Sequence, residues 1–159
     1  MKKNPSPHPS PLEAHLGYWM RFVSNQVSAG FQQEVEASGV SVTDWVALHT
    51  LFDADDGDNP ATHATLTQAL GMTKGAVSKV VARLEDKSLV ARADALQDAR
   101  SHTLSLTPAG RALVPVLAAK ADANDEQFFG HLPAAERQRL ARLLQEMVRL
   151  HQWQEVPRS

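Results

Sequence analysis

Residues 65–110, TLTQALGMTKGAVSKVVARLEDKSLVARADALQDARSHTLSLTPAG, decide the fold. They predict a short helix, a turn, a second helix that ends near Ser88, and two short strands (90–93 and 103–106) joined by a charged tip. The polar face of the second helix carries basic and hydroxyl side chains, and the tip carries Arg100. This order is typical of a helix-turn-helix followed by a wing, which can place a helix in the major groove of DNA and an arginine beside or in the minor groove.

Capping residues predict where these helices begin and end. Thr65 and Gln68 have capping-box spacing, which predicts the start of the first helix, and Gly71 predicts its end. Thr73 predicts the start of the second helix. The pair Thr107–Pro108 predicts the start of another helix, which runs to about residue 129.

Helical patterns with wide apolar arcs flank this stretch. They cover residues 12–37, residues 108–129 and a last helix that opens at Pro133. Between the first pattern and the quoted stretch, residues 42–53 form one more helix, with a capping box at Ser41 and Asp44. The arcs exceed what a small winged domain can cover, which favours packing against a second copy of the chain; a monomeric helical bundle is the alternative.

Length and composition indicate one globular domain of 159 residues. The net charge is −2, but residues 74–111 hold seven basic and four acidic side chains, a local charge of +3. No apolar run approaches the length of a membrane span, and the absence of cysteine is compatible with the cytoplasm. We expect residues 1–11, which include four prolines and no apolar stretch, to form a disordered arm rather than a secretory signal.

The candidate DNA contacts lie on the second helix and the wing. The lysines would neutralise phosphates, Ser78 would contact a base edge or a phosphate, and Arg83 would read guanine with two hydrogen bonds. On the wing, Asp98 would orient Arg100 through a charge-assisted hydrogen bond. The alternative is an ordinary solvated helix face. The full set is Thr73, Lys74, Ser78, Lys79, Arg83, Arg92, Asp98 and Arg100.

Nothing in the sequence indicates an enzyme, a metal site or a cofactor. The seven histidines include no pair at a spacing of three or four, and there is no cysteine. The acidic stretch 53–60 differs from a calcium loop, because Gly57 is its fifth residue instead of the sixth and Ala64 stands where the loop needs a glutamate. Phosphate-binding glycine loops, nucleophile elbows and paired catalytic carboxylates are absent from the sequence.

Three segments resemble the MarR family of winged helix-turn-helix transcription regulators. They are residues 66–92, the triplet Asp98-Ala99-Arg100, and LSLTPAGRAL at 104–113. Family wings often read Asp-Pro-x-Asp-x-Arg, whereas residues 94–100 contain one more residue and no proline. The resemblance covers about residues 12–155.

The resemblance implies a mainly α fold with a small β-wing. A winged helix-turn-helix core at about 42–107 would lie between dimerisation helices at about 12–37 and 108–155. It also implies a homodimer bound to a pseudo-palindromic double-stranded DNA operator. Regulators of this family are mostly repressors, and many release DNA when a small aromatic or phenolic ligand binds. The functional alternative is a winged-helix protein-interaction module without DNA binding, against which the local positive charge and Arg100 argue.

The candidate effector residues lie on the two helices that would line the ligand pocket. Arg21 or His49 could pair with an anionic aromatic ligand. The alternative is that the aromatic side chains belong to the core and that Arg21 lies at the surface. The candidates are Tyr18, Trp19, Arg21, Phe22, Trp45 and His49.

Overall fold

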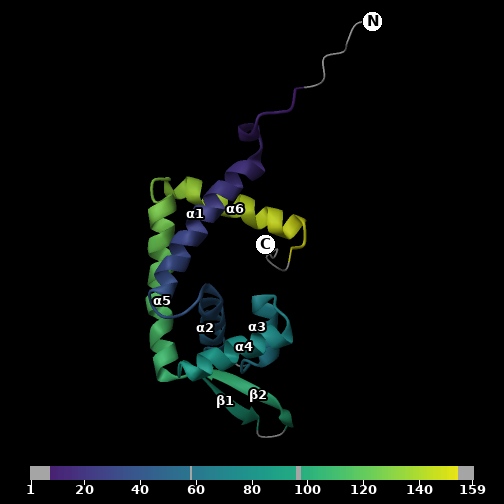
Figure 1. The fold of residues 1–159 in the computed structure, drawn as a ribbon, viewed down its shortest axis with the longest axis vertical. Coiled ribbons are helices and arrows are strands. Elements are labelled where there is room, and N and C mark those ends of the chain that lie inside the picture. The colour runs from purple at the N-terminus through teal and green to yellow at the C-terminus, as the bar shows by residue number, and fades with distance from the viewer. Residues whose placement is uncertain (1–7, 58, 96–97, 154–159) are drawn as a thin grey trace, which may run out of the picture.

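The computed structural model describes residues 8–57, 59–95 and 98–153, without the side chains of residues 94–101. Helices α2, α3 and α4 and the β-hairpin form a compact body, from which α1 and α5 extend toward α6 at the other end of the molecule (Figure 1). The elements, in chain order, are the 3₁₀ turn η1 (Leu12–Ala14), α1 (Leu16–Glu36), α2 (Val42–Asp55), α3 (His63–Leu70), α4 (Lys74–Asp86), β1 (Val90–Ala95), β2 (Asp98–Leu106), α5 (Pro108–Phe129) and α6 (Ala134–Leu150).

The core joins the compact body to α5 and to the end of α1. Helix α4 contributes its inner face, where Val77, Val80, Val81 and Leu84 are buried. Each buried valine or leucine contributes roughly 1.5–3 kcal/mol relative to an exposed one, so this face holds α4 firmly in place. The other core residues are Val35, Val40, Ala47, Leu48, Leu51, Ala61, Leu66, Val90, Leu104, Val114 and Leu117.

The start of α3 differs from the sequence prediction. Thr62, not Thr65, is the N-cap, and α3 begins at His63. Thr65 is the third helical residue: its Oγ1 accepts a hydrogen bond from the Thr62 N–H at 3.0 Å. Both threonines fit a capping pattern, and the one closer to the preceding loop takes the cap.

The turn between α3 and α4 follows the prediction. Gly71 ends α3 in the left-handed conformation, with φ of 59°, which glycine adopts without the Cβ penalty. Thr73 is the N-cap of α4, and its Oγ1 accepts a hydrogen bond from the Ala76 N–H at 3.3 Å. A turn of three residues, 71–73, therefore joins the two helices of the helix-turn-helix.

The hairpin is longer than predicted. β1 and β2 are antiparallel with Val90 opposite Leu106, and the register shifts between Asp94 and Ala95. Alternation predicted only the base of the hairpin, whereas backbone pairing continues toward the tip. At the base, the Leu104 N–H donates to the Ala61 carbonyl at 2.9 Å, which attaches the wing to the start of α3.

The Thr-x-x-Gly sequence at 107–110 packs the start of α5 against residues 87–89, the turn between α4 and β1. The Thr107 hydroxyl donates to the Ser88 carbonyl at 2.6 Å and accepts from the Gly110 N–H at 3.1 Å. A Cβ at Gly110 would lie 2.1 Å from the Leu89 carbonyl oxygen, so only glycine permits this approach. The predicted helix from Pro108 to residue 129 is confirmed.

The terminal helices leave much apolar surface exposed. α1 begins at Leu16 instead of residue 12, because His15 has an extended backbone that separates it from η1. Helix α6 contains no buried residue. Among the described helices, none combines the length and apolar composition that a membrane span requires. Exposed apolar side chains of η1, α1, α6 and the residues after it include Leu12, Leu16, Trp19, Met20, Phe22, Val23, Leu140, Leu143, Leu144, Met147, Val148, Leu150 and Trp153.

Candidate nucleic-acid interface

The outer face of α4 carries a basic surface on its N-terminal half. Lys74, Ser78 and Lys79 are exposed on the side opposite the buried valines. Within the described residues, neither lysine forms an ion pair, so both ammonium groups are available to phosphates. Thr73 precedes them and uses its side-chain oxygen to cap the helix.

His63 lies beside this surface, and sequence reasoning did not single it out. Its Nε2 lies 3.0 Å from the Ser78 Oγ, and its Nδ1 lies 3.5 Å from the Thr67 Oγ1. The Ser78 hydroxyl also donates to the Lys74 carbonyl at 3.0 Å. A prediction of Thr62 as the N-cap would have placed His63 in the first turn of α3. The contact with Ser78 depends on how α3 packs on α4, which the sequence does not show.

Arg83 lies on the C-terminal half of α4 and binds a buried carboxylate. Its Nε donates to the Asp44 Oδ1 at 3.0 Å, and its Nη2 donates to the same oxygen. The other carboxylate oxygen accepts from the Ser41 N–H at 2.9 Å and lies 3.6 Å from the Lys87 Nζ. Two of the five guanidinium donors of Arg83 are thus used within the chain, and its reading of guanine stays a prediction.

Asp44 lies where three parts of the chain meet: α4, the N-terminus of α2 and the α1–α2 corner. Burial of its carboxyl would by itself raise its pKa, but the hydrogen bonds from Arg83 and Ser41 and the charges of Arg83 and Lys87 outweigh this effect, so that the pKa is lowered. Lys87 also donates to the Gly39 carbonyl at 2.6 Å. The cluster therefore fixes α4 to the N-terminus of α2 and to the α1–α2 corner.

The wing carries the remaining candidates. Arg92 of β1 donates from its Nε to Glu85 of α4 at 2.6 Å, which braces the wing against the helix. Asp98 and Arg100 lie in strand β2. Their side chains lie outside the described part of the structure, as do residues 96–97 of the tip, and the Asp98–Arg100 pair stays a prediction.

The candidate effector residues form two separate groups. Tyr18 packs against Trp19 and Phe22, with ring centroids 5.2 and 5.3 Å apart, near the start of α1. Trp45 packs instead between Phe31 and His49, at 6.3 and 5.0 Å, where α1 meets α2.

The two groups do not share a pocket within one chain. Tyr18 and Phe31 are thirteen residues apart on one helix, a separation of roughly 20 Å, which exceeds the size of a small aromatic ligand. His49 is paired through its Nδ1 with Asp53 at 3.1 Å, and Arg21 is exposed.

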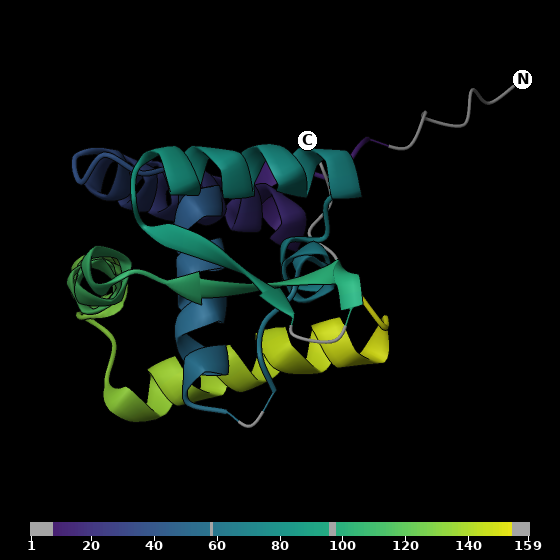
Figure 2. The same cartoon turned by 90° about the horizontal axis from the view of Figure 1, so that it is seen from below.

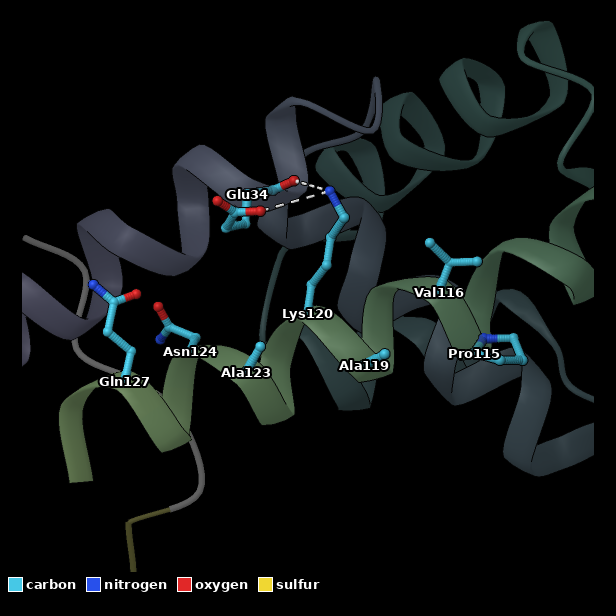
Figure 3. A pocket seen from close by; sticks show the side chains of 8 residues that line it. All are labelled: Glu34, Pro115, Val116, Ala119, Lys120, Ala123, Asn124 and Gln127. Carbon is cyan, nitrogen blue, oxygen red and sulfur yellow. Dashed lines mark hydrogen bonds and ion pairs between the residues drawn. The ribbon is translucent and has the colours of Figure 1, made fainter. Parts of the chain in front are cut away.

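A groove between α1 and α5 contains none of these candidates (Figure 3). Ala119 and Ala123 leave the space open, and Lys120 closes one side by donating to the Glu34 carbonyl at 3.0 Å. The Lys120 ammonium also lies 3.7 Å from the Glu34 carboxylate, which neutralises it. The groove therefore offers small apolar side chains and a charge that already has its counterion.

A profile of the MarR family matches residues 38–101, which run from the α1–α2 corner through the wing. Over these residues the chain carries the pattern of the MarR family. The curated relatives include the repressor NicR of Pseudomonas putida, 26% identical over 155 residues that cover 93% of this chain and 96% of NicR. Another is the repressor Rv2887 of Mycobacterium tuberculosis, 28% identical over 139 residues that cover 85% of this chain and 94% of Rv2887.

Among solved structures, BpsR of Bordetella bronchiseptica superposes with a TM-score of 0.72 at 28% sequence identity. The match covers 88% of this chain and 97% of BpsR, whose DNA binding is regulated by 6-hydroxynicotinic acid. Because the similarity extends over most of both chains, it includes the terminal helices as well as the winged body, which consists of α2, α3, α4 and the β-hairpin. The predicted resemblance to the MarR family and the predicted winged helix-turn-helix fold are thus confirmed.

Proposed function

We propose that this protein is a sequence-specific DNA-binding transcription regulator that acts as a repressor in the cytoplasm. The observation that carries the proposal is the outer face of α4, on which Lys74, Ser78 and Lys79 stand exposed beside the wing. The buried inner face presents this surface as a rigid unit, as a recognition helix requires. Repressors such as NicR and Rv2887 are similar over most of their length. We propose that the protein is not an enzyme.

The terminal helices support a homodimer. Leu143, Leu144 and Met147 of α6 have exposed fractions of 45%, 38% and 40%, and Phe22 of α1 has 56%. An isolated soluble chain rarely exposes so continuous an apolar surface. A closed two-fold dimer that buries it would present two α4 helices to the halves of a pseudo-palindromic operator.

The regulating ligand is proposed to be a small anionic aromatic compound. BpsR, which responds to such an acid, is a structural relative. In this chain Trp45 and His49 offer an aromatic face and a nitrogen-bearing ring at the junction of α1 and α2. Since Tyr18, Trp19 and Phe22 lie far from them along α1, we propose Trp45 and His49 as the ligand contacts within one subunit.

Fluorescence polarisation with the DNA upstream of the protein's own gene tests the proposal. We expect salt-dependent binding that survives an excess of unrelated DNA and weakens when an effector such as a hydroxylated aromatic acid is added. Arg100→Ala should weaken specific binding if the wing enters the minor groove. Equal affinity for all DNA would contradict sequence-specific binding, and failure to bind any DNA would support the protein-interaction module.

A further inference from the structure

Ser78 occupies the middle of the exposed face of α4, between Lys74 and Lys79 and in the half of a recognition helix that contacts base edges. A free serine hydroxyl accepts or donates, so by itself it selects weakly among bases. In this structure the hydroxyl has two partners inside the chain, and those partners decide what it can offer to DNA.

Two neighbouring groups determine which hydrogen bonds the Ser78 hydroxyl donates and accepts. The carbonyl of Lys74, 3.0 Å away, can only accept, so it takes the single hydroxyl hydrogen. The His63 Nε2 is also 3.0 Å away, and it must therefore be the donor in its contact with the Ser78 Oγ. One of the two oxygen lone pairs is then used by His63, and one lone pair remains.

Thr67, one turn further along α3, lies beside the His63 ring. The Thr67 hydroxyl donates to the His63 carbonyl at 2.9 Å, and its oxygen lies 3.5 Å from the ring Nδ1. His63 is half-buried, so the ring is enclosed by its surroundings on part of its surface. The imidazole thus stands between α3 and α4 with Nε2 directed at Ser78.

We propose that the Lys74 carbonyl, which takes the hydroxyl hydrogen, and the His63 ring, which fixes the oxygen, together make Ser78 an acceptor-only reader of the major groove, so that Ser78 selects a base that presents an amino group. Adenine N6 and cytosine N4 are the amino donors of that groove, whereas guanine O6 and thymine O4 are acceptors. The inference rests on the proposed DNA-binding function and adds a specificity-determining residue, His63, that itself touches no base. Without His63, the Lys74 carbonyl still accepts the hydroxyl hydrogen, but the Ser78 oxygen regains a second lone pair. The hydroxyl is then held by one partner instead of two and can rotate toward a base acceptor.

Single-base profiles of an operator half-site test this proposal. The operator is obtained by in vitro selection with the wild-type protein, and each base pair is then changed in turn while polarisation measures affinity. Comparison of wild type with Ser78→Ala locates the position that Ser78 reads. We expect adenine or cytosine there, and replacement by the base analogue that lacks the amino group (purine or 2-pyrimidinone) should weaken wild-type binding roughly fivefold or more.

Three variants separate positioning from folding. His63→Ala should reduce the preference for the amino-bearing base over its keto counterpart to within about twofold, and leave the profile at other positions unchanged. His63→Gln should retain much of the preference, because the glutamine amide places an N–H donor near the position of Nε2. His131→Ala removes an exposed histidine beyond α5 and should change nothing. Thermal midpoints of all variants report folding.

The outcomes distinguish this inference from the function on which it rests. Failure of the wild-type protein to bind any DNA would remove the proposed function itself. Specific binding with guanine or thymine at the position that Ser78 reads would overturn only the inference, as would an unchanged preference in a folded His63→Ala protein. The same holds if Ser78→Ala leaves the whole profile unchanged.

Discussion

Replacing Asp44 by Asn tests the ion cluster that joins α2 to the recognition helix. Asparagine has nearly the same size but only one acceptor oxygen, so its NH₂ group must face a donor, either the Ser41 N–H or the Arg83 guanidinium. Loss of the capping-box contact costs about 0.5–2 kcal/mol, and loss of a hydrogen bond to a charged group about 1.5–3 kcal/mol.

The expected loss in free energy of unfolding is smaller than the loss for a wholly buried ion pair. Asp44 is fully buried, but the side chains of Arg83 and Lys87 are 43% and 36% exposed, so water can solvate both cations once the carboxylate is gone. Removing one partner of a wholly buried pair costs about 3–5 kcal/mol. We therefore expect Asp44→Asn to lower the free energy of unfolding by about 2–4 kcal/mol at pH 7.

Urea unfolding followed by circular dichroism, at one fixed protein concentration, measures this loss. The matched control is Glu126→Gln, which breaks the exposed pair between Arg137 and Glu126 and should cost less than about 1 kcal/mol. Because the pKa of Asp44 is lowered in the folded state, its carboxylate stabilises the protein above the unfolded value of about 3.9. The difference between wild type and Asp44→Asn should persist from pH 7 to about pH 5 and shrink as the pH falls through about 3.9 toward the lower folded value. A variant as stable as wild type at pH 7, or a difference that grows in acid, would refute the reasoning.

Three further changes test the helix junction, the dimer and the recognition helix. Gly110→Ala should destabilise the protein by about 1–3 kcal/mol in thermal or urea unfolding, because its Cβ would lie 2.1 Å from the Leu89 carbonyl oxygen; stability equal to wild type would contradict the close approach. Leu143→Glu or Met147→Glu should damage assembly and folding together, which sedimentation detects, whereas a folded wild-type monomer of about 17 kDa would exclude the proposed interface. Lys79→Ala should weaken binding to every DNA sequence and lower the salt-dependence slope by about one, and an unchanged slope would remove Lys79 from the phosphate contacts.

Local spacing in the sequence predicted most of the fold. The buried face of α4, the caps at Ser41, Thr73 and Thr107, and the end of α3 at Gly71 all depend on residues within four positions of one another. Such contacts form within a single helical turn, so the sequence order alone determines them. The predicted start of α3 was wrong because Thr62 and Thr65 both satisfy the local capping pattern. The hydrogen bonds between the two residues distinguish the cap, and their spacing in the sequence does not.

The site could be predicted only as a surface. Sequence periodicity placed Lys74, Ser78 and Lys79 on one outer face of α4, as the structure has them. It could not show that Arg83 turns toward Asp44, 39 residues away, or that Ser78 meets His63, 15 residues away. These partners come from the packing of separate helices, and helix periodicity says nothing about which neighbouring element a polar side chain reaches.

These contacts divide the basic side chains of the winged body into two kinds. Arg83 uses its donors on Asp44 of α2, and Arg92 of β1 donates to Glu85 of α4, so these contacts fix the orientation of α4 relative to α2 and the wing. Lys74 and Lys79 have no ion-pair partner within the described residues, and an ammonium on a flexible stem suits the neutralisation of phosphates. We therefore propose that Arg83 and Arg92 set where the recognition helix lies, that Lys74 and Lys79 supply affinity that is independent of sequence, and that base discrimination falls to side chains such as Ser78. For that reason a variant that removes Arg83 should lose stability and DNA binding together, whereas one that removes Lys74 or Lys79 should lose only DNA binding.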